Sequence, residues 1–138
     1  MAKKKTPYMD DQSWTDVRDG MRIDWDVPIE MDDGLVLRCD VFRPIKDGKY
    51  GVIMTYGPYG KFLHFDDAYH DQYERMLEDF PEIGAGTSEK YQNWEVVDPE
   101  RWVPDDYVCI RVDGRGTGRS PGVIDIWSLR EAQDLAIC

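Results

Sequence analysis

Residues 107–122 read YVCIRVDGRGTGRSPG, and this stretch decides the fold. Its first part, residues 107–113, alternates apolar and mixed side chains and predicts a strand that is buried over most of its length. The second part is a charged turn rich in glycine. A strand that leads directly into such a turn is typical of the carboxyl edge of an α/β sheet, where ligands and catalytic groups collect. The stretch therefore predicts an α/β fold.

Residues 118–122 spell G-x-S-x-G, the signature of the nucleophilic serine of α/β-hydrolases. That site needs a strand directly before the first glycine, a helix directly after the serine, and a backbone N–H after the serine for the oxyanion hole. Here the predicted strand already ends at Asp113, and Pro121 has no N–H to donate. No histidine follows in the chain. We therefore do not expect Ser120 to be a nucleophile.

Two other interpretations of this turn stay open. Its backbone N–H groups could hold a phosphate, with Arg115 and Arg119 adding positive charge. The spacing G-x-G-x-x-G fails, however, because arginine occupies the last position, and the Walker pattern is absent. The alternative is a structural turn in which glycines adopt positive φ and an arginine pairs with Asp113 or Asp125. The residues assigned to the structural turn are Arg115, Gly116, Gly118 and Ser120.

The composition excludes several classes of protein. The 138 residues fit one domain at most and can bury a core. With 28 acidic and 17 basic residues the formal net charge is −11, which argues against a nucleic-acid partner. The lysine run at residues 3–5 predicts a solvated tail. No apolar leader follows it and no long apolar run exists, so we predict no secretion and no membrane span, and expect a cytoplasmic protein.

The cysteines and histidines give no metal pattern. Cys39 and Cys109 fall inside predicted strands, as small buried side chains in a reducing compartment would, and Cys138 shares no ligand spacing with them. His64 and His70 are too far apart for a helical zinc pair. The sequence therefore predicts neither a metal nor a cofactor.

A hairpin is predicted near the amino terminus. Residues 1–20 are polar, with Trp14 as the one large side chain, and predict an arm over the surface. Residues 21–31 and 35–43 then alternate in polarity around an Asp-Asp-Gly turn, a strong hairpin signal. Pro28 indicates an edge or a bulge in the first strand. We expect this hairpin to form the antiparallel margin of a larger sheet.

The next segment joins a strand to an unusual loop. Residues 50–56 (YGVIMTY) form an apolar run that predicts a central strand covered on both faces. The loop GPYGK follows at residues 57–61 and holds Tyr59 at the strand end. Two readings of Tyr59 stay open: an aromatic ring packed on its neighbours, or a group fixed there for chemistry.

Residues 21–138 are predicted to form one partial domain with an insertion at about 62–104. Residues 67–80 predict a helix in the insertion, which is longer than a simple connection requires. A second helix is predicted from Leu129, because Ser128 and Glu131 have the spacing of a capping box. Ala132, Leu135 and Ala136 are assigned to its buried side. No capping signal closes this helix, so we expect the natural sequence to continue.

Three motifs in order resemble the CocE/NonD hydrolases, relatives of the X-Pro dipeptidyl-peptidases and the α-amino-acid ester hydrolases. They are PYGK at residues 58–61, WVP at 102–104 and VDGRGTGRSPG at 112–122. The DGL turn at 33–35 and the FRP strand end at 42–44 match the amino-terminal hairpin of that family. The resemblance spans roughly residues 17–138.

The resemblance implies the amino-terminal part of an α/β-hydrolase sheet, an antiparallel hairpin followed by parallel strands, that stops before the nucleophile elbow. It implies a serine hydrolase for ester or amide substrates, acyl or X-Pro dipeptidyl, in which the hydroxyl of Tyr59 donates to the oxyanion hole. The nucleophile, acid and histidine would lie in a longer parent, so the chain alone would be inactive. The alternative is a non-catalytic α/β module with a partner-binding role or none of its own.

Overall fold

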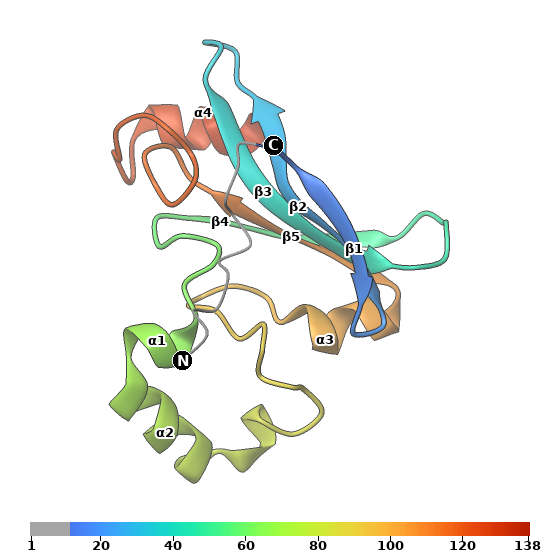
Figure 1. The fold of residues 1–138 in the computed structure, drawn as a ribbon. Coiled ribbons are helices and arrows are strands. Elements are labelled where there is room, and N and C mark those ends of the chain that lie inside the picture. The colour runs from blue at the N-terminus through green and yellow to red at the C-terminus, as the bar shows by residue number, and fades with distance from the viewer. Residues whose placement is uncertain (1–11) are drawn as a thin grey trace.

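The computed structural model describes residues 12–138, so the predicted lysine tail lies outside the described residues. One five-stranded sheet has the order β1-β2-β3-β5-β4 (Figure 1). Its strands are β1 (Trp14–Arg18), β2 (Met21–Glu30), β3 (Val36–Pro44), β4 (Gly51–Gly57) and β5 (Tyr107–Asp113). The first three pairings are antiparallel, and β4 pairs with β5 in parallel. The predicted mixed α/β sheet is thus confirmed.

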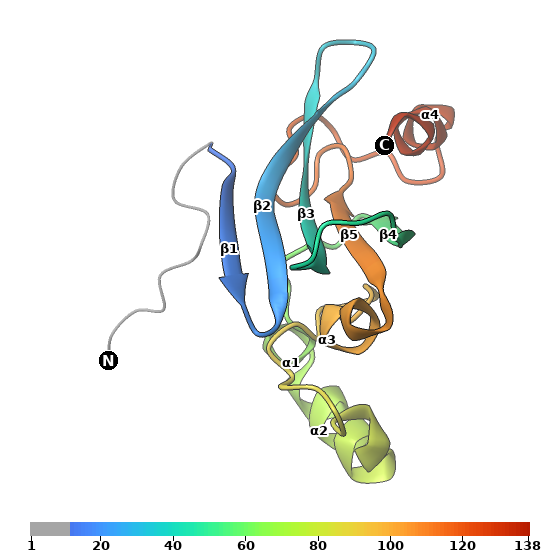
Figure 2. The same cartoon turned by 90° about the vertical axis from the view of Figure 1, so that its right-hand side faces the viewer.

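The helices are short. They are α1 (Phe65–Ala68), α2 (His70–Asp79), α3 (Pro99–Trp102) and α4 (Leu129–Ile137), with 3-10 turns η1 (Pro81–Ile83) and η2 (Val103–Asp105). Figure 2 shows α1 and α2 extending away from the sheet, at the opposite end of the molecule from α4. The single helix predicted over residues 67–80 is broken at Tyr69, which caps α1 and precedes α2.

The β2–β3 hairpin forms as predicted, with Gly34 at φ +80° in its turn. The strand β2 bulges between Asp24 and Val27, where the amide of Asp26 donates to a carboxylate oxygen of Asp40 at 2.9 Å. β1 pairs with β2 only as far as Trp25. Pro28 therefore lies just past the bulge, where the far side of β2 has no strand partner among residues 12–138.

Part of the predicted polar arm is instead a strand. Trp14–Arg18 forms β1 and pairs along β2, which corrects the expectation for these residues. The ring of Trp14 stacks on Trp25 with centroids 6.0 Å apart. Edge pairing and the packing of Trp14 outweigh the low apolar content of the segment, because tertiary context overrides local composition.

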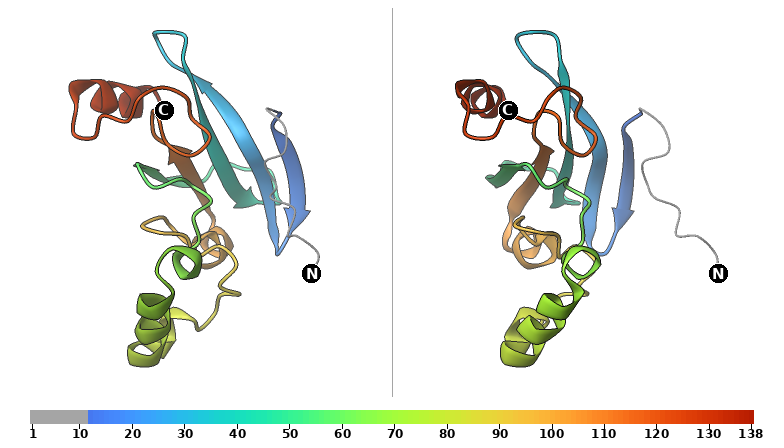
Figure 3. Two further views of the ribbon diagram at one scale, coloured as in Figure 1. Left: turned by 60° about the vertical axis from the view of Figure 1, so that its left-hand side comes forward. Right: turned by 90° about the vertical axis from the view of Figure 1, so that its left-hand side faces the viewer.

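Each face of the sheet carries an apolar cluster. The face covered by the insertion is the better buried one, with Met21, Ile23, Trp25, Phe42, Tyr91, Val103 and Cys109. The other face contains Met31, Leu37, Cys39 and Val112, surrounded by half-buried side chains. The guanidinium of Arg111 on β5 donates to the carbonyl of Val97 at 2.8 Å and to that of Tyr91, so the insertion is fixed to the sheet. Figure 3 shows helices α1 and α2 of the insertion, in green, extending below the sheet, away from α4.

The strand predicted to be central lies at the edge of the described sheet. β4 pairs only with β5 among the described residues, and Val52 is 58% exposed. The apolar run of residues 50–56 indicates that the strand is suited to burial, but it carries no information about which neighbours cover it. The prediction of a strand is therefore confirmed, while its central place is corrected.

The helix predicted from Leu129 is α4, and its amino-terminal cap is formed, although the Glu131 carboxylate reaches one residue beyond the N-cap Ser128. The hydroxyl of Ser128 accepts from the amide of Glu131 at 3.1 Å, and the Glu131 carboxylate accepts from the amide of Trp127 at 2.7 Å. The predicted buried side is wrong. Ala132, Leu135 and Ala136 are exposed, whereas Asp134 is fully buried because two arginines pair with it.

Candidate active site

The loop after β4 meets the turn after β5 at one edge of the sheet. Because β4 and β5 are parallel, both strands end there, with Gly57 opposite Asp113. The amide of Gly114 donates to the carbonyl of Gly57 at 3.1 Å. Gly60 has φ +86°, a conformation that favours glycine, so the loop turns sharply between Tyr59 and Lys61.

Tyr59 is presented to solvent at this edge. Its side chain is 46% exposed, and its ring meets Trp94 edge to face with centroids 6.1 Å apart. The phenol hydroxyl makes no hydrogen bond to another residue of the described part of the chain. A cavity of about 90 Å³ lies between the loop and residues 94–96 of the insertion. The hydroxyl can therefore donate to a group that enters from solvent.

A buried charge cluster lies directly beneath this loop. It contains the carboxylates of Asp26, Asp40 and Asp113, one each from β2, β3 and β5, and the ammonium of Lys61. Arg119 adds a contact of 3.3 Å to Asp26. Burial raises the pKa of Asp113, an effect opposed by the amide of Arg119 and the charge of Lys61.

The sequence did not predict that Lys61 lies in the middle of a buried charge cluster. A lysine in a glycine-rich loop is expected in solvent, yet this one is 2% exposed. Asp26 and Asp40 alternate with apolar neighbours in their predicted strands and would be placed on the polar face, so the pattern gives no signal of burial. Buried carboxylates require a cation. The sequence does not show which cation reaches them.

The turn after β5 is formed by glycines and ion pairs. Gly116, Gly118 and Gly122 have φ of +75°, +53° and +105°. A Cβ on Gly118 would lie 2.4 Å from a carboxylate oxygen of Asp113, so no side chain fits there. Gly116 and Gly118 thus occupy positions that require glycine.

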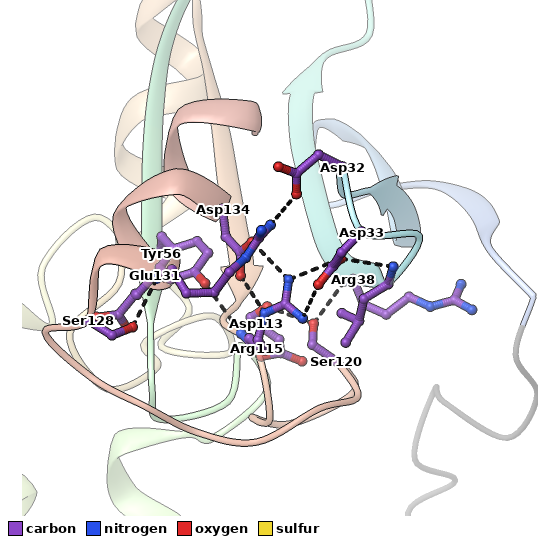
Figure 4. Close-up of polar contacts among 12 residues, drawn as sticks. Asp32, Asp33, Arg38, Tyr56, Asp113, Arg115, Ser120, Ser128, Glu131 and Asp134 are labelled. Carbon is purple, nitrogen blue, oxygen red and sulfur yellow. Dashed lines mark hydrogen bonds and ion pairs between the residues drawn. The ribbon is translucent and has the colours of Figure 1, made fainter.

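Arg115 joins this turn to two distant segments. Figure 4 shows its guanidinium between Asp134 of α4, at 2.7 Å, and Asp33 of the β2–β3 turn, at 2.9 Å. Among the described residues no arginine side chain of the turn pairs with Asp113 or Asp125, and Asp113 instead accepts from the backbone amide of Arg119 at 2.7 Å. Hydrogen bonds from Arg115 and then Arg130 hold the pKa of Asp134 below its ordinary value. Hydrogen bonds to Asp134 and then Asp33 raise the pKa of Arg115.

Ser120 is a buried structural residue in this turn. It is 5% exposed, its hydroxyl donates to the carbonyl of Asp113 at 2.6 Å, and it accepts from the amide of Arg38 at 2.9 Å (Figure 4). Neither histidine contacts it. His64 bonds to the carbonyl of Glu89, and His70 to the carboxylate of Asp66. Among residues 12–138, Ser120 thus has no histidine in contact to act as its general base.

The described residues offer no group of three or more side chains that could bind a metal ion. Within the same part of the chain, helices long and apolar enough to cross a bilayer are absent.

Comparison with known proteins identifies a family and similar solved structures. Residues 33–137 match the family described as X-Pro dipeptidyl-peptidase (S15 family). A crystal structure of a CocE/NonD family hydrolase from Staphylococcus aureus is similar with a TM-score of 0.67 and 37% identity, over 85% of this chain and 20% of that chain. A second structure of that hydrolase gives 0.65 and 37%, over 83% and 19%. No curated protein matches. This chain spans about a fifth of the length of these structures.

Proposed function

We propose, since the chain belongs to the X-Pro dipeptidyl-peptidase (S15) family of hydrolases, that it is the amino-terminal part of a serine hydrolase for ester or amide bonds. We call the longer protein the parent hydrolase. Its substrates would be small molecules with an acyl or an X-Pro dipeptidyl group. Within it, Tyr59 is the oxyanion-hole donor supplied by this chain.

One observation supports the role of Tyr59: its hydroxyl lies at the carboxyl edge of two parallel strands and has no partner among the described residues. A tetrahedral intermediate of acyl transfer carries negative charge on one oxygen. A phenol O–H that is already in place stabilises that charge without reorganising as the charge develops. The loop glycines and the Trp94 ring restrict where the phenol can lie.

The rest of the catalytic machinery is proposed to lie elsewhere in the parent hydrolase. Ser120 is buried and lacks a base, and the histidines bond to other groups. One donor without a nucleophile and base is not a hydrolytic site. The 138-residue chain alone should therefore give only background hydrolysis of an activated ester, and turnover abolished by Ser120→Ala would overturn this assignment.

Exposed apolar side chains favour a second candidate, a module that binds a partner. Val123, Trp127 and Leu129 are 78%, 94% and 75% exposed, and β4 is an edge strand of the described sheet. In the parent hydrolase the remainder of the protein would cover this surface. A compact monomer of the isolated chain in size-exclusion chromatography would favour a self-sufficient module, whereas aggregation would favour the hydrolase part.

Tyr59→Phe in the parent hydrolase tests the proposed function. Because only the hydroxyl is lost, we expect kcat to fall by more than about tenfold with KM little changed. Tyr69→Phe is the matched control, since Tyr69 is a similarly exposed ring packed on the same Trp94. An unchanged kcat for Tyr59→Phe would refute the oxyanion role.

A further inference from the structure

We infer that Lys61 is the positioning residue for Tyr59, holding its loop through a buried ammonium; this rests on the proposed function of Tyr59. The side chain of Lys61 is fully buried, so it cannot touch a substrate. Its effect on the reaction would pass through the backbone of the loop. The inference therefore concerns where the Tyr59 hydroxyl is held.

Lys61 is held at all three of its polar groups. Its amide donates to a carboxylate oxygen of Asp113, and its carbonyl accepts from the side-chain amide of Asn93. Its ammonium lies 3.2 Å from Asp40 and 3.3 Å from Asp26. These partners come from three strands and from the insertion, so movement of Lys61 would break contacts in several directions.

Burial makes the charge contacts hard to break. An ammonium or carboxylate removed from water is stable only when paired, and separating such a pair leaves both charges uncompensated. The Lys61 side chain and those of Asp26 and Asp40 are at most 1% exposed. The loop cannot lift from the sheet without exposing this cluster.

The distance along the chain from Lys61 to Tyr59 is short. Two residues span at most about 7 Å, so fixing Lys61 confines Tyr59 to a small volume. The other end of the loop is fixed as well, because the carbonyl of Gly57 accepts from the amide of Gly114. On the outer side, Trp94 contacts the Tyr59 ring, and its amide donates to the carbonyl of Leu63 at 3.0 Å.

Asn93 allows the inference to be tested without removing a buried charge. Asn93→Ala deletes the side chain that holds the Lys61 carbonyl and leaves the ammonium cluster intact. A displacement of about 1 Å in a catalytic group can cost on the order of 10²-fold in rate. We expect a smaller loss here, about five- to tenfold in kcat with KM unchanged, because the other Lys61 contacts remain.

The experiment is a double-mutant cycle in the parent hydrolase, combining Asn93→Ala with Tyr59→Phe. If Asn93 and Lys61 act by positioning the Tyr59 hydroxyl, Asn93→Ala lowers kcat in the Tyr59 background and has almost no further effect with Phe at that position. Gln92→Ala is the matched control, because Gln92 bonds to Tyr73 and Ile83 and not to Lys61. Additive losses from Asn93→Ala and Tyr59→Phe would overturn the inference.

A second readout separates this inference from the proposed function. With 3-fluorotyrosine at position 59, Asn93→Ala and Lys61→Met should shift or broaden the fluorine resonance, and Gln92→Ala should not. The Lys61→Met result is used only if thermal unfolding shows that this variant is folded. If it is not folded, the Asn93→Ala result alone decides the test. An unmoved resonance overturns the positioning role of Lys61. A moved resonance together with a normal kcat for Tyr59→Phe would support positioning and refute the oxyanion role.

Discussion

The hydroxyl of Ser120 donates to the carbonyl of Asp113 at 2.6 Å, which ties the glycine-rich turn back onto the strand that precedes it. Ser120→Ala should therefore act on stability. Loss of the hydroxyl leaves that carbonyl and the Arg38 amide without a partner, so unfolding should become easier by about 1–3 kcal/mol. Urea unfolding would measure this change. The exposed Ser13→Ala is the control, because the Ser13 hydroxyl makes no hydrogen bond to another described residue, and it should stay within about 0.5 kcal/mol. A loss of kcat in the folded parent hydrolase would contradict the structural assignment.

Gly116 and Gly20 form a matched pair for measuring how much an added side chain at Gly116 reduces the free energy of unfolding. Their φ angles are +75° and +76°, but an added Cβ would lie 2.3 Å from the amide nitrogen of Ile124 at Gly116 and meets no atom within 4 Å at Gly20. Gly20→Ala should cost about 1–2 kcal/mol from the backbone conformation alone. Gly116→Ala should cost at least about 1–3 kcal/mol more. Equal urea midpoints for the two variants would show that the backbone around Gly116 shifts to accept the added Cβ, and would contradict this prediction.

Asp134 should contribute to acid sensitivity. Arg115 and Arg130 lower its pKa in the folded protein, so its contribution to stability is complete above the unfolded value near 3.8 and is lost as the pH falls through the folded pKa. Asp134→Asn should reduce stability at neutral pH and flatten the decline below about pH 4. Unfolding followed from pH 7 to pH 2 measures both effects. Asp125→Asn removes an exposed carboxylate without an ion pair among residues 12–138, and the same slope change there would refute the assignment to Asp134.

The local signals in the sequence predicted the elements well. The Asp-Asp-Gly turn, the apolar run at residues 50–56 and the Ser128 capping box each correspond to an observed hairpin, strand or helix start. The family resemblance is confirmed by the match over residues 33–137. These signals are short in range, so they carry their information within a few residues.

Those short-range signals could not predict how segments that lie far apart in the sequence contact one another. Trp14–Arg18 becomes a strand because β2 offers it an edge, and α4 buries Asp134 because Arg115 approaches from a turn 19 residues away in sequence. Tyr59 was assigned through the family resemblance, and its catalytic role stays a prediction. Lys61 could not be found, since its burial depends on aspartates brought together by three strands.

The strand order has a consequence for synthesis on the ribosome. β4 is made before β5, yet β5 occupies the place between β3 and β4. From Gly57 to Tyr107 the ribosome must add 50 residues, which takes roughly 3–10 s at about 5–20 residues per second. During that interval β4 has emerged without its partner, and the β3 edge of the finished hairpin is open. The nascent chain therefore exposes one unpaired apolar strand and one open sheet edge for seconds, the state in which chaperone binding or aggregation competes with folding.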